Sequence, residues 1–417
     1  MTNIQLVAAI IFAIALIHTF AAKSFERLAH RHPKHAGLLH LLGEIEVVFG
    51  FWAFVLIVAM ALVSGGKAAL DYAESRHYTE PLFVFVIMVI AASRPVLEIV
   101  KTLISVIART VPLNTTIVQV WLCLALVPLI GSLITEPAAM TLAALMLGPL
   151  VFRPGIPESL KYAALGVLFV NVSIGGTLTS FAAPPVLMVA STWNWDSAFM
   201  VATFGWKTAI AVLINATGVT FLLRSHLKEH RPEEGQDAKS GVPMIVSAVH
   251  LVFLSAVVLF AHHPVIFIGL FLFFLGFTKA YEQFQSPLIL KEGLLVGFFL
   301  AGLVVLGGMQ QWWLQPIVAS LEPTALFFGA LGLTAITDNA ALTYLGSLID
   351  GMSDTAKYML MAGAVAGGGL TVIANAPNPA GVALLRHGFN DESIDMLGLL
   401  AGALLPTAIA ALCLLLF

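Results

Sequence analysis

Thr135-Glu136-Pro137-Ala138-Ala139-Met140-Thr141 places a carboxylate inside an otherwise apolar part of the chain. A second stretch, Thr337-Asp338-Asn339-Ala340-Ala341-Leu342-Thr343, has the same pattern. Five positions of the two stretches, Glu136 and Asp338 among them, correspond at a constant offset of 202 (337 minus 135). Because a charged side chain at membrane depth is costly and is usually kept for function, these two carboxylates are the first candidates for a functional site.

The composition is that of a membrane protein. The chain has 417 residues, of which 59% are hydrophobic and 10% charged, and its mean hydropathy is +0.96. A soluble domain carries about 25% charged residues. Since the alternation of barrel strands is absent and one helical crossing takes about 20 residues, we predict an all-α polytopic membrane protein with about ten to twelve transmembrane helices.

Other classes of protein are disfavoured by the same composition. The formal charge of −3 and the absence of a basic domain give no indication of nucleic-acid binding. The two cysteines lie in apolar segments and provide neither a disulfide framework nor a metal motif. The apolar run 4–22 has no small-residue cleavage site after it, so we expect a retained first helix rather than a signal peptide.

The pattern of apolar and polar segments predicts two repeats. A first helix and a basic, His-rich loop (23–40) occupy 1–42, and a polar linker over 224–242 separates repeat 1 (43–223) from repeat 2 (243–417). Each repeat contains a candidate re-entrant hairpin, whose arms are too short to cross the membrane alone, and a candidate broken helix. The hairpins are predicted at 115–150, with arms 115–134 and 138–150, and at 323–350, with arms 323–336 and 340–350. The broken helices are predicted at 160–191 and 357–388.

The two predicted breaks also correspond to each other. Leu178, Thr179, Ala182 and Pro185 match Leu370, Thr371, Ala374 and Pro377 at an offset of 192 (370 minus 178). Proline removes a backbone donor and so maintains such a break; the prolines concerned are Pro184, Pro185, Pro377 and Pro379. Interrupted segments in corresponding positions of two halves indicate the midplane binding site of a secondary transporter.

At these residues the chain resembles the ion transporter superfamily, which includes divalent anion/sodium symporters, arsenite pumps and a class of Na+/H+ antiporters. Members carry a Ser-Asn-Thr-like hairpin tip and, further on, a Gly-Gly-x-x-Thr-x-x-Gly-Thr-Pro-Pro-Asn-like unwound helix in each half. The tips here are Thr135-Glu136-Pro137 and Thr337-Asp338-Asn339, and the breaks run from Gly175-Gly176 to Pro185 and from Gly368-Gly369 to Asn378. The similarity is strongest to the branch named "putative Na+/H+ antiporter".

The resemblance implies two inverted repeats, a dimerising scaffold and a transport domain that moves as an elevator. The chain also departs from the superfamily pattern. Carboxylate symporters have neutral Ser-Asn at the tips, where this chain has Glu136 and Asp338, and the first break has Val186 where the second has Asn378. Dicarboxylates are therefore disfavoured as substrates.

The polar residues of the tips and breaks suit a small hard cation. Na+ or Li+ is bound by oxygen atoms, which carboxylates, hydroxyls, amides and the carbonyls of unwound helices supply. The candidate ligands are Glu136, Asp338, Thr135, Thr337, Asn339, Thr179, Thr371, Asn375 and Asn378. Burial favours a protonated carboxyl and a nearby cation favours the ionised form, so a proton and Na+ would compete for Glu136 and Asp338. The alternative interpretation is structural: such groups also bond to neighbouring helices, and threonine commonly bonds to its own helix.

Two further clusters are weaker candidates. His40 and Glu44 are four residues apart and would share a helix face, so that with Glu46 they form a possible proton relay; the alternative is a solvated helix end. His30, His32 and His35 titrate near neutrality and would sense pH, bind adventitious metal or simply be solvated.

We therefore predict a secondary Na+/H+ antiporter with no cofactor beyond the transported Na+ (or Li+) and H+, a homodimer in the bacterial inner (cytoplasmic) membrane. The alternative is an H+- or Na+-coupled anion or carboxylate carrier of the same superfamily. An intramembrane enzyme is disfavoured because the chain has no His-Glu-x-x-His, Gly-x-Ser-x-Gly or paired-Asp motif. The chain has neither a filter-like segment nor a phosphate-binding loop, which argues against a channel and against an ATP-driven pump.

Overall fold

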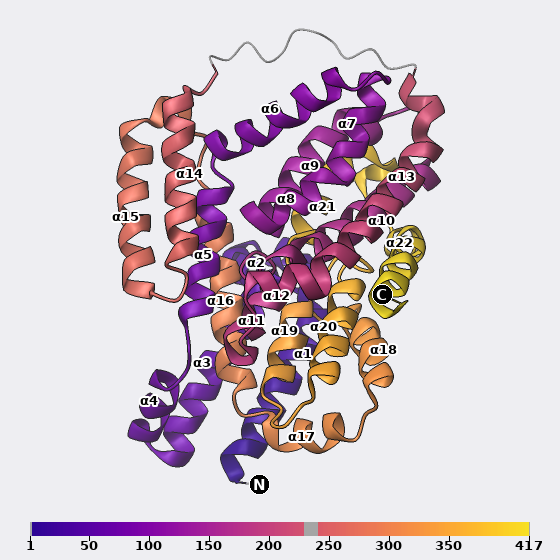
Figure 1. The fold of residues 1–417 in the computed structure, drawn as a ribbon. Coiled ribbons are helices and arrows are strands. Elements are labelled where there is room, and N and C mark those ends of the chain that lie inside the picture. Colours follow the sequence, from indigo (N-terminus) through magenta and orange to yellow (C-terminus); the bar gives the residue numbers. More distant parts are fainter. Residues whose placement is uncertain (1, 229–240, 417) are drawn as a thin grey trace.

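The structure is a computed structural model that describes residues 2–228 and 241–416 of the chain (Figure 1). Throughout these residues the regular secondary structure is helical. The helices before the undescribed stretch are α1 (Asn3–Arg31), α2 (Ala36–Gly43), α3 (Ile45–Ser64), α4 (Gly66–Glu74), α5 (Thr79–Ala91), α6 (Arg94–Thr110), α7 (Thr115–Leu124), α8 (Leu126–Ile134), α9 (Glu136–Val151), α10 (Glu158–Gly175), α11 (Pro184–Trp193), α12 (Ser197–Met200) and α13 (Trp206–Lys228).

The helices of the remaining part are α14 (Met244–Leu259), α15 (Pro264–Ala280), α16 (Leu290–Gly307), α17 (Gln311–Ala319), α18 (Pro323–Thr334), α19 (Asn339–Ser347), α20 (Asp354–Gly367), α21 (Asn378–Leu385) and α22 (Met396–Leu416). Short 3₁₀-helical turns, and one π-helical turn (η3), lie between helices in both parts of the chain. They are η1 (Pro33–His35), η2 (Gly176–Leu178), η3 (Val201–Gly205), η4 (Glu282–Phe284), η5 (Arg386–Gly388) and η6 (Asn390–Glu392). The predicted all-α polytopic membrane fold is confirmed.

Fewer helices are long enough to cross a membrane than the ten to twelve that we predicted. In the described part of the chain, six helices have the length and hydropathy of a span, and counting each bent helix pair as one span gives up to eight. The bent pairs are α5 with α6, at 61°, and α7 with α8, at 43°. Four shorter apolar helices, α9, α14, α15 and α18, fall below the length of a full crossing. The ten to twelve helices of the prediction include such shorter segments.

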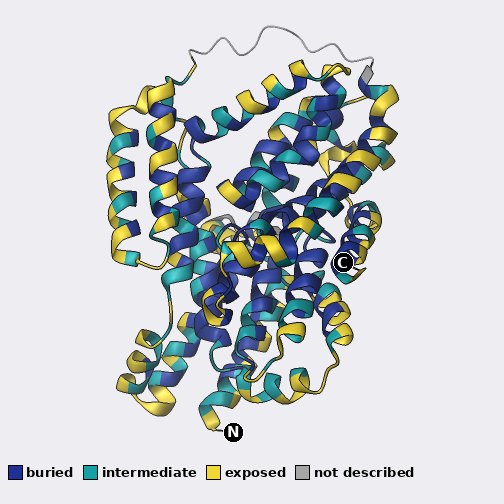
Figure 2. Cartoon of the chain, viewed as in Figure 1, coloured by how far each residue is buried: buried dark blue, intermediate teal, exposed yellow. Residues whose placement is uncertain are grey.

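The buried residues gather at the centre of the molecule, around α8 to α11 and α20 (Figure 2). The outer surface is apolar in many places, as lipid contact requires. Large apolar side chains are exposed along α14 and α15, namely Met244, Ile245, Val252, Leu259, Val265, Leu272 and Phe273. Such a surface would be unusual on a soluble monomer and fits a lipid environment.

The first hairpin is α7, α8 and α9, in the upper part of Figure 1. Its first arm, which we predicted as one segment over 115–134, is bent because Pro128 has no N–H to donate to the carbonyl of Leu124. The Asn171 side chain of α10 donates to this Leu124 oxygen instead, at 2.8 Å. The chain then reverses direction at the single residue Thr135, between α8 and α9.

The second hairpin is α18 and α19, in the lower part of Figure 1. Four residues, 335–338, join its arms, and Asp338 begins α19 as its N-cap. The broken helices are also present: α10 and η2 stop before α11, and α20 stops before α21. Helix pairs and helix interruptions thus occur within the ranges given for the hairpins and breaks, and their re-entrant arrangement in a membrane stays a prediction.

The segment 23–40, which we predicted as a loop, is largely helical. α1 continues to Arg31, and α2 begins at Ala36 after a turn at Pro33. Helix-forming residues in 23–31 extend α1 beyond the apolar run, and proline disfavours the helical conformation of the residue before it, so α1 ends there. In the predicted linker 224–242, α13 continues to Lys228, and residues 229–240 lie outside the described residues.

Close packing of α10 on α22 depends on glycine. A Cβ at Gly166 would collide with the backbone of Gly402, and a Cβ at Gly402 would collide with the carbonyl of Tyr162. Small residues let helix backbones approach in this way. The pair holds α10, which carries the first break, against the C-terminal helix.

We expect Gly402→Leu to lower the thermal unfolding midpoint of the detergent-solubilised protein, because overpacking a tight contact costs about 1–3 kcal/mol. Gly218→Leu on α13 is the matched control, since no atom lies within 4 Å of a Cβ placed there. Fluorescence-detected thermal unfolding measures both. Equal midpoints for the two variants would contradict the close contact.

Candidate functional site

Glu136 is the first residue of α9 and is fully buried. Its Oε2 accepts a hydrogen bond of 2.9 Å from Nδ2 of Asn375, which lies in the second break. Its Oε1 has no hydrogen-bond partner among the described residues. None of the ion pairs in the described part of the chain involves this carboxylate. A buried carboxylate is costly unless a proton or a cation neutralises it.

Gly176 of the first break lies directly against Glu136. A Cβ at this position would collide with Oε1 of the carboxylate and would come within 2.8 Å of its Cγ. The glycine thus leaves the space in which Oε1 faces the break. The hairpin tip and the broken helix of the first half are in contact at this point.

Thr135 adopts a strained backbone. Its φ of +103° is an outlier for a β-branched residue, and such conformations cost about 1–3 kcal/mol. The strain allows α8 and α9 to meet at one residue, which places Glu136 in the first turn of α9. The buried hydroxyl Oγ1 of Thr135 has no partner among the described residues.

Corresponding threonines in the two breaks hold the hairpin tips. Thr179 donates its hydroxyl to the carbonyl of Ser132 at 2.6 Å, and Thr371 donates to the carbonyl of Ala335 at 2.8 Å. Both carbonyls lie where the first arm of a hairpin ends and have lost their helical partners. These threonines therefore fasten tip to break in both halves, and their oxygen atoms retain lone pairs for a ligand.

Asp338 has a different environment from Glu136. Its Oδ1 accepts hydrogen bonds from the N–H groups of Ala340 (2.8 Å) and Ala341 (3.0 Å), so it caps α19. The side chain also lines a small cavity, of about 30 Å³, together with Glu46 and Asn375. Both tip carboxylates thus lie at helix N-termini, where the positive end of the helix dipole stabilises an anion.

Three asparagines add unpartnered amide atoms to this region. Asn339 is fully buried, and within the described part of the chain neither its Oδ1 nor its Nδ2 is hydrogen-bonded; the Oδ1 atoms of Asn375 and Asn378 likewise have no partner there. Asn378 uses its Nδ2 to bridge the carbonyls of Gly368 (2.8 Å) and Thr371 (2.9 Å) across the break. Buried polar atoms are normally hydrogen-bonded, and an accumulation of orphan oxygens is what a dehydrated cation would satisfy.

Segments of the two halves cross at the site. Asn375 of the second break bonds to Glu136 of the first hairpin across 239 positions of the chain. Within the second half, the N–H of Asn339 donates to the carbonyl of Ala374 at 3.1 Å. Ser173 of α10 donates its hydroxyl to the carbonyl of Val365 of α20 at 2.8 Å. The carboxylate of the first hairpin tip therefore receives its hydrogen bond from the break of the second half.

A model of the family described as "Putative Na+/H+ antiporter" matches residues 3–417. The chain belongs to this family. It is accordingly a multi-pass integral membrane protein and, at the level at which the family is described, a cation/proton antiporter rather than an enzyme. No curated protein matches the chain.

The remaining predicted residues of this antiporter are placed less centrally. Thr337, in the segment that joins α18 to α19, donates its hydroxyl to the carbonyl of Leu333 of α18 at 2.8 Å. Pro184 and Pro185 begin α11, while Pro377 and Pro379 flank the start of α21. All four prolines thus stand where a helix resumes after a break.

The predicted relay of His40, Glu44 and Glu46 divides between two environments. Glu44 pairs with Lys291 at 2.9 Å, whereas Glu46 lines the cavity at Asp338. His40 lies on α2 and is exposed. His32 and His35, which lie between α1 and α2, are also exposed. The side chain of His30 lies outside the described residues. Within the described part of the chain, no group of three His, Cys, Asp or Glu residues could hold a metal ion.

Sequence reasoning missed two residues that shape the site. Ser132 donates its hydroxyl to the carbonyl of Gly175 at 2.7 Å and accepts from the N–H of Leu178 at 3.0 Å, bridging the first tip and break. Asn171 donates a hydrogen bond to the Leu124 carbonyl, which has no helical donor at the bend of the first hairpin. The sequence signal for Ser132 and for Asn171 was a polar residue within an apolar helix. One such residue does not indicate which backbone group its side chain will contact.

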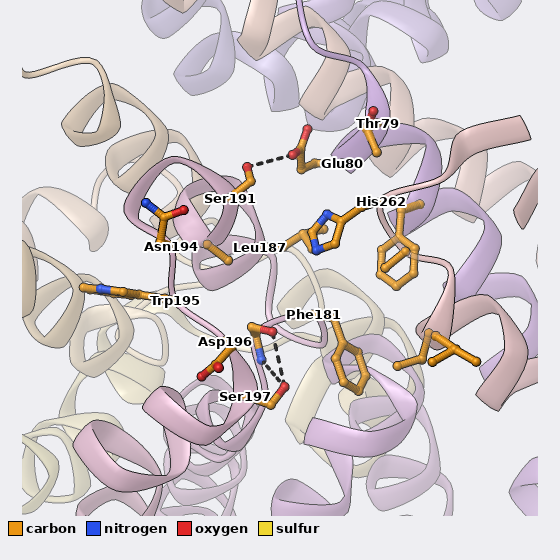
Figure 3. Close-up of a pocket in the computed structure, with 16 residues that line it drawn as sticks. Thr79, Glu80, Phe181, Leu187, Ser191, Asn194, Trp195, Asp196, Ser197 and His262 are labelled. Atoms are coloured by element: carbon orange, nitrogen blue, oxygen red, sulfur yellow. Dashed lines mark hydrogen bonds between the residues drawn. The ribbon is translucent and has the colours of Figure 1, made fainter. Parts of the chain in front are cut away.

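A larger hollow, of about 680 Å³, lies beside the first break (Figure 3). Ser180 and Phe181 of the break line it, and the acidic residues Glu80 and Asp196 face it from α5 and from the start of α12. Ser191 donates to Glu80 at 3.0 Å. The hollow brings acidic groups next to the break that contains Gly176.

We expect Gly176→Ala to lower the thermal unfolding midpoint because the added methyl group meets the Glu136 carboxylate, an overpacking cost of about 1–3 kcal/mol. In a Glu136→Ala background the methyl group has free space, so the same change should have little effect there. A double-mutant cycle of unfolding midpoints measures this coupling. Additive effects would show that Gly176 does not contact Glu136.

Proposed function

We propose that the protein exchanges Na+ for protons at Glu136. The observation that carries the proposal is a fully buried carboxylate with one hydrogen bond, surrounded by segments whose oxygens lack partners. In the absence of a cation, burial favours the protonated, neutral carboxyl. A cation entering the site favours the ionised form and so displaces the proton. One carboxylate then carries either ion, but not both.

The residues around Glu136 suit a small monovalent cation. Thr135 adjoins Glu136 in the chain, Asn375 bonds to it, and each holds a buried oxygen without a partner among the described residues, as does Asn378 of the second break. Na+ and Li+ prefer such neutral and anionic oxygen ligands. Asn375 donates to the Glu136 carboxylate through Nδ2 and thereby orients it while its own Oδ1 stays available.

The same charges disfavour an anion as cargo. A carboxylate substrate would meet Glu136, Asp338 and Glu46 with no described ion pair to neutralise them. Two acidic residues, Glu80 and Asp196, line the hollow of Figure 3 together with His262, and we propose this hollow as the aqueous approach to the first break. Clefts lined by one sign of charge concentrate the opposite ion, which here is a cation.

We further propose the architecture of the ion transporter superfamily for this antiporter: two inverted repeats (43–223 and 243–417), an elevator-like movement of hairpins and breaks, and a homodimer in the bacterial inner membrane. Support for the repeats comes from the corresponding Thr179 and Thr371 contacts and from the positions of the hairpins in opposite parts of Figure 1. Movement of the loaded tips as a unit would expose Glu136 to each side in turn.

The test is proton flux in proteoliposomes containing an internal pH dye. Na+ or Li+ should trigger proton movement with the wild type, and Glu136→Gln should abolish it because an amide cannot bind and release a proton. Glu282→Gln is the matched control, since Glu282 is exposed and pairs only locally with Lys279. Unchanged exchange in Glu136→Gln would overturn the assignment. Proton movement triggered by an anion and by no cation would instead establish the anion carrier.

A further inference from the structure

The end of α1 and the short helix α2 form a hook (residues 24–43) beside the first membrane span. The span of α1 covers Asn3–Ala22, and the helix continues to Arg31, nine residues further (31 minus 22). The chain then turns and begins α2 at Ala36. Nine helical residues extend up to about 13 Å, and a lipid headgroup layer is about 5–7 Å thick. The turn of the hook therefore lies at or beyond the headgroups.

Hydrogen bonds fix how far α2 returns toward the bilayer. The indole Nε1 of Trp52 on α3 donates to Nδ1 of His18, inside the span of α1, at 3.0 Å. The other ring nitrogen of His18, Nε2, therefore carries the proton and donates to the carbonyl of Leu42 at 2.9 Å. Since α2 packs back against α1, its end lies level with His18. The hook thus passes through the headgroup layer and ends at the depth of the apolar span.

The outward surface of the hook is basic at its turn and apolar along its helices. Leu28 and Arg31 of α1 are three residues apart, share a helix face and are exposed. Leu38 and Leu41 of α2 have the same spacing and are also exposed. Lys34 is exposed at the turn between the helices. Exposed leucines therefore continue from the basic turn toward the depth of the span.

The hook has an excess of positive charge. The sequence over 23–43 contains four Lys or Arg residues and one acidic residue. Arg31 and Lys34 take part in none of the ion pairs among the described residues. His32 and His35, exposed in the same turn, add ring N–H donors. An anion outside the chain can therefore approach the turn and be bound there.

The combination of charge and exposed leucines selects a phospholipid over a soluble anion. A soluble anion gains nothing from leucines that lie below the basic turn. A phospholipid has its phosphate at headgroup depth and its acyl chains directly beneath, so one molecule meets both features. Basic and large apolar side chains together bind at this boundary, and Lys or Arg near an anionic membrane surface adds to the binding. Long basic side chains also extend to reach the headgroups.

We propose that the hook is a binding surface for an anionic phospholipid. The lipid phosphate is held by Arg31 and Lys34, and the acyl chains pack along Leu38 and Leu41. The occupant comes from the leaflet that surrounds the end of the first span. The proposal is independent of the ion exchanged at Glu136, because it concerns a different surface of the molecule.

A fluorescent reporter on α2 tests the proposal locally. Gly37 is exposed, and a Cβ placed there meets no atom within 4 Å, so Gly37→Cys can carry a bimane label. The native Cys123 and Cys413 are buried. The labelled full-length protein is reconstituted in phosphatidylcholine vesicles that contain a small fraction of doxyl-labelled phosphatidylglycerol or doxyl-labelled phosphatidylcholine. We expect the anionic lipid to associate with the reporter about tenfold more strongly or better. Equal quenching by the two lipids would overturn the proposal.

Charge variants assign the preference to the turn. Arg31→Gln/Lys34→Gln should bring the quenching by the two lipids close to equality. The matched control Lys67→Gln/Arg109→Gln removes one Lys and one Arg charge from exposed side chains elsewhere and should keep the preference. An unchanged preference in the first variant, or an equal loss in the control, would contradict binding at the hook.

Two further measurements keep the test decisive. If the double variant does not elute as a monodisperse protein, Lys34→Gln replaces it, with the preference expected to fall roughly fivefold; no fall would overturn the proposal. Inorganic phosphate added to the vesicles distinguishes a lipid from a free anion. We expect phosphate to leave the preference for phosphatidylglycerol in place at constant ionic strength, and its abolition would show a simple anion site instead of a lipid surface.

Discussion

The structure depends on the cost of burying the Glu136 carboxylate. Removing such a charge from water costs several kcal/mol unless a partner compensates, yet this side chain has a single hydrogen bond, from Asn375. The strained Thr135, the glycine at 176 and the start of α9 all serve to hold the carboxylate in this position. Either a proton or a cation compensates the charge, and in the proposed exchange the two compete for this one carboxylate.

The arrangement also explains why two halves of the chain are needed. The first tip supplies Glu136, but its hydrogen-bond donor comes from the second break. Each tip is fastened to the break of its own half by a threonine hydroxyl, so a displacement of either break is transmitted to a tip. Binding at one carboxylate is thereby coupled to the geometry of both halves.

Much of this organisation was predictable from the sequence, because membrane insertion penalises charge and broken backbone so strongly. Glu136, Asp338 and the proline-containing breaks stand out for that reason, and the structure places them together. Other features depend on contacts that no local pattern encodes. The pairing of Asn375 with Glu136 spans 239 positions, and the separation of Glu46 from Glu44 depends on which helix each one meets. The predicted loop at 23–40 was wrong because helix propensity extends α1 past its apolar run.

The most direct measurement of the central claim is the number of protons released when Na+ binds to the purified antiporter in a weakly buffered solution. Competition at one buried carboxylate predicts that Na+ binding to the wild type releases protons and that Glu136→Gln releases fewer by about one per chain. Proton release that is the same in the two proteins would contradict the account, as would Na+ binding to the wild type without any release.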